Sequence, residues 1–183
     1  MDNLTIVDVE TTGMAPPYDR IIEIGLAVIE KGQLVDTWST LVNPQRSINP
    51  IITSLTGITS EQLQTAPEFG DIYTKLLEYL QGRTFVAHNV RFDYGFIKAE
   101  LDQLGCKYHA AQLCTVRLSR NLYPTYKRHG LSSLIERFNL DIPQRHRALD
   151  DALAVWQFLK HSHQLHGPEK LKLAIDAIVK RPS

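Results

Sequence analysis

Apolar positions in the first quarter of the chain follow the pattern of buried β-strands. Short runs rich in branched side chains alternate with turn residues, and three strands are predicted, at residues 4–9, 21–29 and 34–42. Lys31-Gly32-Gln33 predicts a hairpin turn between the second and third. Asn43-Pro44 and Asn49-Pro50 then interrupt the regular pattern. The chain therefore begins with strands that pair antiparallel.

The rest of the chain alternates helical periodicity with two short strand-like runs. Apolar residues three and four apart predict amphipathic helices, and Gly82 and Gly105 stand where two of them end. The predicted helices cover about 60–66, 68–81, 92–104, 116–122, 130–138, 147–164 and a last one from Pro168, and the predicted strands cover 84–87 and 111–115. Strands that alternate with helices favour parallel pairing. We therefore expect an α/β fold with a mixed sheet of about five strands flanked by helices.

Two carboxylates interrupt the first strand. Asp8 and Glu10 lie two residues apart, so their side chains share one face of the strand. Like charges in a poorly hydrated place are costly unless a cation compensates them. Clustered carboxylate oxygens are the ligands that Mg²⁺ and Mn²⁺ prefer. An exposed strand end is the simpler explanation of such a pair, and the pattern alone does not decide.

Two further segments carry acids where a strand or loop enters a helix. Asp93 lies in the first turn of the helix after the strand 84–87, at the kind of sheet edge where ligands bind. His146 precedes a helix whose first turns hold Asp150 and Asp151. Residues five apart diverge on one helix, so His146 must lie on the preceding loop if it is to meet Asp151. Taken alone, each segment is better explained by acids that favour a helix N-terminus, with His146 as an exposed loop residue.

The three segments together are more specific than any one of them. VDVETTG at 7–13, HN-x-x-FD-x-x-F at 88–96 and H-x-A-x-x-DA at 146–152 resemble the DEDDh 3′→5′ exonuclease family. This family includes the proofreading epsilon subunit of bacterial DNA polymerase III. The resemblance runs from residue 4 to about 160 and takes in the segment 41–59. It implies a ribonuclease H-like sheet, which agrees with the predicted order of strands and helices.

The resemblance also implies a role for each motif position. Asp8, Glu10, Asp93 and Asp151 match the four acids that hold two divalent cations, Mg²⁺ or Mn²⁺. His146 matches the general base, and imidazole suits that role near neutral pH. The turn that contacts the terminal nucleotide is matched by Thr11, Thr12 and Gly13. The chain departs from many relatives at Thr56, where they have histidine, and no catalytic role depends on that position.

The expected function is hydrolysis of terminal phosphodiesters at the 3′ end of single-stranded or frayed DNA, with release of nucleoside 5′-monophosphates. A polymerase or another repair protein is the expected partner. Two alternatives stay open at this point: an exoribonuclease that trims RNA, and a non-catalytic nucleic-acid-binding module of a larger complex. Residues 1–166 are predicted to form the exonuclease domain, with 167–183 as a helical extension of the same domain.

Charge and composition add two expectations. The net charge is zero, which is unusual for a protein that binds nucleic acid non-specifically, yet residues 117–147 hold seven Lys or Arg against two acids. Some of these cations are candidates for substrate phosphates, and Tyr126 or Tyr123 for stacking on bases. Cys106 and Cys114 are expected to be buried thiols without a disulfide. The N-terminus shows no signal sequence and no apolar run spans a membrane, so we expect a cytoplasmic protein.

Overall fold

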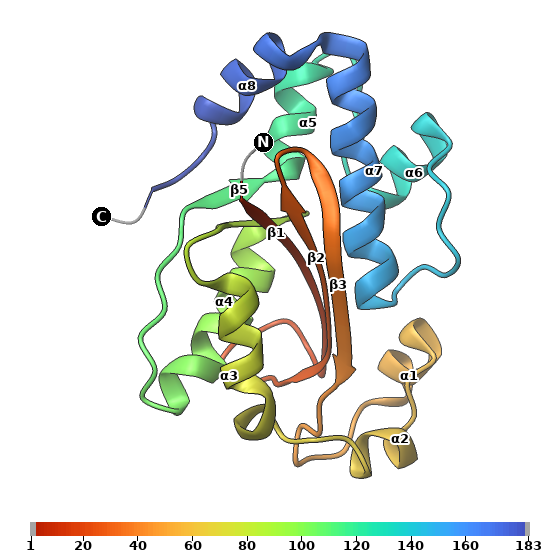
Figure 1. The fold of residues 1–183 in the computed structure, drawn as a ribbon. Helices are drawn as coiled ribbons and strands as arrows, with labels where there is room; N and C mark the ends of the chain where they lie inside the picture. Colours follow the sequence, from red (N-terminus) through yellow and green to blue (C-terminus); the bar gives the residue numbers. More distant parts are fainter. Residues whose placement is uncertain (1–2, 182–183) are drawn as a thin grey trace.

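Five strands form one mixed sheet in the order β3-β2-β1-β4-β5, as seen in the computed structural model, which describes residues 3–181 (Figure 1). β1 pairs antiparallel with β2 and parallel with β4. On the outer sides, β2 pairs antiparallel with β3 and β4 pairs parallel with β5. The strands are β1 Leu4–Thr11, β2 Ile21–Glu30, β3 Gln33–Leu41, β4 Thr84–Ala87 and β5 Gln112–Cys114. The mixed sheet predicted from the sequence is confirmed.

Helices cover both faces of the sheet (Figure 1). α3 and α4 bury their apolar side chains against one face, and α5 to α8 bury theirs against the other. The helices are α1 Pro50–Thr56, α2 Ser60–Gln64, α3 Phe69–Leu80, α4 Val90–Gln103, α5 Thr115–Leu122, α6 Leu131–Phe138, α7 Ala148–His166 and α8 Pro168–Asp176. Leu171 and Ala174 of α8 belong to the same buried cluster as α5 and α7.

Three sequence predictions need correction. Asn49-Pro50 was expected to interrupt the regular pattern, but it begins the helix α1. The Asn49 side chain accepts a hydrogen bond from the backbone N–H of Ile51, and proline is favoured at the first helical position. β1 continues through Glu10 to Thr11, so both Asp8 and Glu10 lie within the strand. Cys106 and Cys114 are free but only partly buried, since one follows a helix end and the other closes the edge strand β5.

Small residues let α7 lie directly on the sheet. Ala148 and Ala152 of α7 are fully buried. Gly25 of β2 completes the contact, because a Cβ at this position would lie 2.1 Å from the backbone nitrogen of Leu149. Gly25 pairs with Asp8 across the β1–β2 ladder. The close approach therefore brings the start of α7 beside the acidic end of β1.

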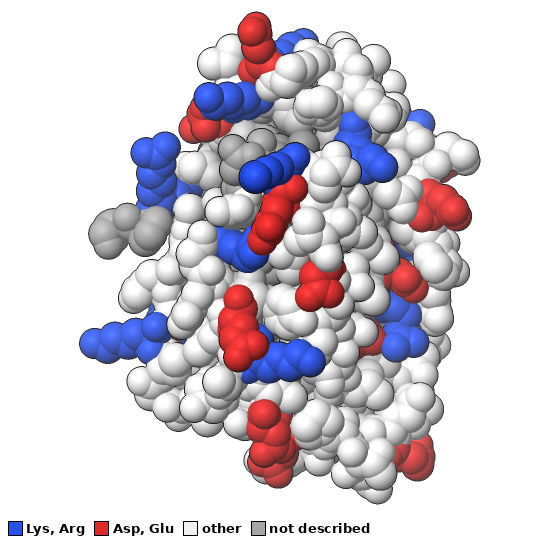
Figure 2. Space-filling view, viewed as in Figure 1, with Lys and Arg blue, Asp and Glu red and all other residues white. Residues whose placement is uncertain are grey.

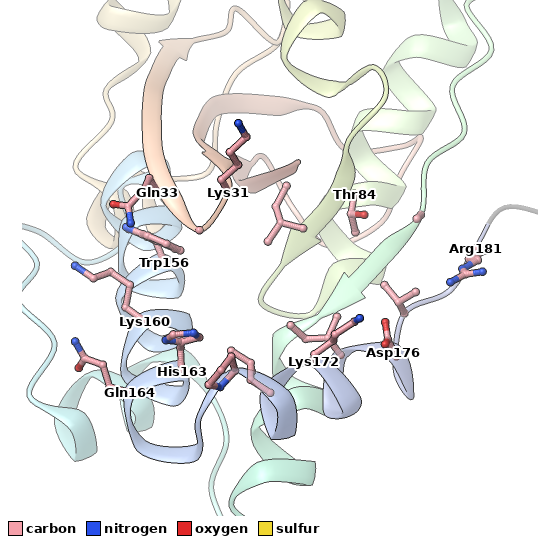
Figure 3. A pocket seen from close by; sticks show the side chains of 17 residues that line it. Lys31, Gln33, Thr84, Trp156, Lys160, His163, Gln164, Lys172, Asp176 and Arg181 are labelled. Atoms are coloured by element: carbon pink, nitrogen blue, oxygen red, sulfur yellow. The ribbon is translucent and has the colours of Figure 1, made fainter. Parts of the chain in front are cut away.

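Charges of both signs are interspersed on the face of the molecule shown in Figure 2, in keeping with the zero net charge. A cavity of about 690 Å³ opens at the end of the sheet where β1 begins, between the β2–β3 turn and the helices α7 and α8 (Figure 3). Its lining includes Trp156, Lys160 and Lys172. Within residues 3–181, none of the helices is long and apolar enough to cross a membrane.

Candidate active site

The acidic residues gather at the end of the sheet opposite that cavity. β1 and β4 are parallel, so their carboxyl ends meet at one edge, which is where open α/β sheets bind ligands. Asp8 and Glu10 alternate with Val7 and Val9 and lie on the face of β1 that α7 covers. Both carboxylates are partly buried.

Asp93 reaches the same place from α4. β4 pairs with β1 only as far as Ile6 and Val86. Beyond Ile6, the edge of β1 that faces β4 is therefore free for other partners, while the opposite edge still pairs with β2. The backbone N–H of Val9 donates to Asp93 Oδ1 at 3.2 Å. Asp93 is 3% exposed. This hydrogen bond fixes the carboxylate of α4 beside the two acids of β1.

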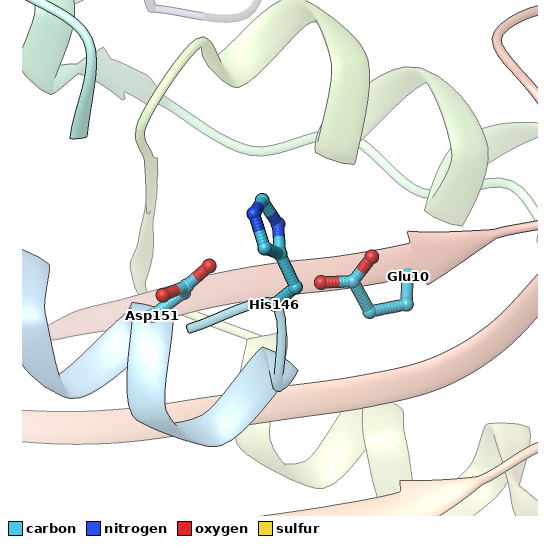
Figure 4. A group of neighbouring side chains, drawn as sticks. All are labelled: Glu10, His146 and Asp151. Carbon is cyan, nitrogen blue, oxygen red and sulfur yellow. The ribbon is translucent and has the colours of Figure 1, made fainter. Parts of the chain in front are cut away.

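His146 and Asp151 approach from α7. The helix begins at Ala148, so His146 lies on the preceding loop, as the spacing required. His146 has a φ of +59°, a left-handed conformation that is uncommon outside glycine and often found at functional sites. Ligand atoms of Glu10, His146 and Asp151 lie within 4.8 Å of one another, and the imidazole stands between the two carboxylates (Figure 4).

The two neighbouring acids of α7 differ in their surroundings. Asp151 is 4% exposed, whereas Asp150 is partly exposed and lies near the guanidinium of Arg147. Successive helical residues point about 100° apart, so they cannot enter one site equally. The structure brings Asp151 to the acidic cluster, in the register that the sequence motif indicated.

An ion pair between the buried Glu23 and the half-exposed Arg147 holds the start of α7 on the sheet. Glu23 of β2 is 3% exposed and accepts from Arg147 Nη2 at 2.8 Å and Nε at 3.1 Å. Its second oxygen accepts from the backbone N–H of Ala148 at 3.0 Å, in the manner of a helix cap. The pair thus fixes the residue that follows His146 and the first turn that carries Asp151.

Burial and mutual repulsion make this cluster hold protons. Burial raises the pKa of Asp93 to about 8, although backbone N–H donors oppose the shift. Burial raises the pKa of Glu10 to about 7, with a further contribution from the charge of Asp151. The pKa of Asp8 is raised well above its usual range by burial and then by the charges of Asp93 and Asp151. A cation among these carboxylates would relieve the repulsion.

Arg145 supplies one such positive charge from the loop. Its guanidinium forms an ion pair with Asp151 and donates to the hydroxyl of Ser132 at 3.2 Å. The charge of Arg145 counteracts the burial that raises the pKa of Asp151. One arginine leaves most of the acidic charge uncompensated. The oxygen-rich donor set therefore fits hard divalent cations.

The turn after β1 is held by its own side chains. Thr11 is buried, and its hydroxyl donates to the carbonyl of Gly13 at 2.6 Å. The hydroxyl of Thr12 bonds Asp19 at 3.3 Å and accepts from the backbone N–H of Arg20 at 3.0 Å. A side chain at Gly13 would collide with Asp19, 2.4 Å away. The turn is a rigid wall directly after Glu10.

Sequence analysis missed the residues that support the site. Glu23 and Gly25 interrupt the apolar run of β2, and both could have been noticed in the sequence. Glu23 is a charged residue in a strand that is predicted to be buried, as Asp8 is. Gly25 has no side chain at a position where the neighbouring residues are large and apolar. Arg145 and Arg147 were noted only as part of a basic stretch. Arg147 pairs with Glu23, 124 positions away in the chain, and Arg145 pairs with Asp151 through a loop that folds back on α7, so periodicity reveals neither ion pair.

Comparisons with known proteins give the context of this geometry. The exonuclease family model RNase_T matches residues 5–159. The "DNA polymerase III PolC-type" protein of Caldanaerobacter subterraneus subsp. tengcongensis is 40% identical over 161 residues, which cover 87% of this chain and 12% of that protein. The "3'-5' exonuclease DinG" of Bacillus subtilis is 40% identical over 169 residues, covering 89% and 18% respectively. The chain thus spans less than a fifth of the length of these relatives.

Solved structures agree with the fold. Exonuclease X in complex with 5′ overhanging duplex DNA superimposes with a TM-score of 0.74 at 26% identity, covering 94% of this chain and 98% of that one. The nuclease domain of 3′hExo, a DEDDh family member bound to rAMP, gives a TM-score of 0.76 at 20% identity, covering 89% and 92%. The second likeness concerns the fold alone.

Proposed function

Since this chain belongs to the exonuclease family whose model spans residues 5–159, we propose that it removes nucleotides one at a time from the 3′ end of single-stranded or frayed DNA. The observation that carries the proposal is the convergence of Asp8, Glu10, Asp93, His146 and Asp151, from β1, α4 and the start of α7, at one end of the sheet. A binding module without catalysis would not need all five groups.

The acids are proposed to hold two divalent cations, Mg²⁺ or Mn²⁺. Four carboxylates carry four negative charges, which two such ions would balance. When bound, the ions would neutralise charge on the phosphate and activate the attacking water. The raised pKa values of Glu10 and Asp93 support this assignment, because burial and then the neighbouring carboxylates disfavour their charged forms, and a bound cation would offset both effects.

His146 is proposed to take the proton from the attacking water. Its ring lies beside Glu10 and Asp151, within reach of a water that these carboxylates would orient. The 3′-oxygen of the next nucleotide then leaves, and a nucleoside 5′-monophosphate is released. Thr11, Thr12 and Gly13 are proposed to contact the terminal nucleotide, because they form the wall that follows Glu10.

Two of the similar proteins favour DNA as the substrate. The PolC-type relative is named a DNA polymerase, while the name of DinG states 3′–5′ exonuclease activity without a substrate. Exonuclease X was solved with DNA. Association with a DNA polymerase or another repair protein is proposed on the same ground, because the PolC-type relative carries a matching segment within a much longer chain.

The test is degradation of single-stranded DNA and RNA labelled at the 5′ or the 3′ end, with Mg²⁺, Mn²⁺ or EDTA. A ladder that shortens from the 3′ end, is abolished by EDTA and is faster on DNA supports the proposal. A duplex with a mismatched 3′ end should be shortened faster than a matched one. Cleavage of a circular strand, or undiminished activity in EDTA, would contradict it.

A further inference from the structure

A hollow with a cationic rim lies between α6 and the loop before that helix. It measures about 410 Å³ and is lined by Lys127, Arg128, Ser133, Glu136 and Arg137. Lys127 and Arg128 are exposed on the loop before α6, and Arg137 lies in the last turn of that helix. Three cations face one acid, on a molecule whose net charge is zero. The hollow therefore carries a local excess of positive charge.

Buried contacts hold the loop that carries these cations. The His129 side chain is buried, with Nδ1 2.8 Å from Ser119 Oγ and Nε2 2.9 Å from the carbonyl oxygen of Tyr126. Arg137 donates to the carbonyl of Arg128 at 2.7 Å. These contacts hold Arg137 and the backbone that carries Lys127 and Arg128, which lowers the entropic cost of binding.

An exposed aromatic ring completes the surface. Tyr126 is 45% exposed, and the guanidinium of Arg137 lies 3.8 Å from the centre of its ring. Arg137 Nη1 is buried and has no hydrogen-bond partner. Tyr123, by contrast, is 6% exposed and belongs to the core. Cations next to an exposed aromatic side chain are typical of surfaces that bind single-stranded nucleic acid.

The hollow connects to the acidic site through the first turn of α6. Ser133 lines the hollow, and its neighbour Ser132 accepts a hydrogen bond from Arg145. Arg145 in turn pairs with Asp151. A strand whose 3′ end lies at Asp151 would therefore meet the cationic rim after passing Arg145.

We propose that Lys127, Arg128 and Arg137 bind backbone phosphates of the substrate strand upstream of the scissile bond, with Tyr126 as a surface for one of its bases. This inference rests on the proposed function, because it assumes a strand with its 3′ end at the acidic cluster. The hollow binds the strand at a second place, apart from the acidic cluster that binds the terminal nucleotide. Longer strands then bind more tightly than dinucleotides.

The test compares two double variants that each remove two positive charges. Lys127→Gln with Arg128→Gln alters the hollow. Lys160→Gln with Lys172→Gln is the matched control, at the cavity on the other end of the sheet (Figure 3). Each is assayed on a labelled 20-nucleotide DNA, on a dinucleotide and on the p-nitrophenyl ester of thymidine 5′-monophosphate, which has no upstream phosphate.

The hollow variant is expected to lose at least tenfold more kcat/KM on the 20-nucleotide strand than on the ester or the dinucleotide. Its binding of the strand, followed by fluorescence anisotropy, should depend less on salt, with a log–log slope smaller by about 1.4 for two lost phosphate contacts. The control should match the wild type. Lys127→Arg with Arg128→Lys should restore binding if charge is what matters.

Equal losses on all three substrates, or a loss in the control as large as in the hollow variant, would overturn the inference. Anisotropy is measured in EDTA as well, so the contact is tested without catalysis. If the wild type cleaves neither the strand nor the ester, the proposed function fails. Binding that is unchanged in the hollow variant would show separately that the hollow is not a strand contact.

Discussion

Replacing Gly25 with alanine tests how strictly the sheet positions the catalytic end of α7. The added Cβ would lie 2.1 Å from the nitrogen of Leu149 and 2.2 Å from the carbonyl carbon of Ala148, both backbone atoms. Ordinary carbon contacts are about 3.5–4.0 Å long. The first turn of α7 would therefore have to move by on the order of 1 Å, since no flexible side chain can yield instead.

This displacement should cost both stability and activity. Overpacking a core costs about 1–3 kcal/mol, and for a domain of this size each kcal/mol lowers the melting temperature by about 2–4 °C. The displaced turn carries Asp151 and follows His146 directly. A misplacement of roughly 1 Å can cost about 10²-fold in rate. We expect Gly25→Ala to lose about that factor in kcat even below its melting temperature.

Gly70→Ala is the matched control. Gly70 lies in α3, where the nearest atom to an added Cβ is Leu104 Cδ2 at 3.9 Å. Alanine in a helix is favoured over glycine by about 0.5–1 kcal/mol, so this variant should be slightly more stable and equally active. Thermal unfolding by circular dichroism and single-turnover cleavage of a labelled strand decide the matter. A Gly25 variant with wild-type kcat and melting temperature would refute the close-contact argument.

Four further perturbations test the site. His146→Ala should lower turnover at least about 100-fold, as loss of a general base does, yet still bind metal in calorimetry; unchanged turnover would assign the proton transfer elsewhere. Asp151→Asn should abolish cleavage while Asp150→Asn keeps most of it; the reverse result would show that the helix register is wrong. Glu23→Gln should lower the melting temperature and kcat together, because it weakens the ion pair of a buried carboxylate and a helix cap; unaltered kinetics would exclude a positioning role. Mg²⁺ should raise the melting temperature more at pH 8 than at pH 5.5. Burial raises the pKa of Asp93 from its ordinary 3.8 to about 8, so at low pH a bound proton stabilises the metal-free fold, and this stabilisation is lost as the pH rises toward 8. Metal must displace that proton at pH 5.5 but not at pH 8. Equal shifts of the melting temperature at both pH values would contradict this.

The sequence alone predicted the elements except α1, and its motifs singled out the residues that the structure brings together. Periodicities of two and of about 3.6 residues are local properties, and they predicted strands and helices in the right order. The acids at 8, 10, 93 and 151 stood out because each lies where a local pattern favours burial or a helix start. Helix α1 was missed because Asn49-Pro50 serves equally to end one element and to begin the next.

Only the tertiary structure decided which residues hold the site together. Glu23, Gly25 and Arg147 act through contacts between β2 and α7, which are more than a hundred residues apart in the chain. The ion pair of Arg145 with Asp151 likewise depends on how the loop folds back on α7. Local patterns report which face of an element is buried. They do not report what lies across from it, because that depends on the packing of the whole chain.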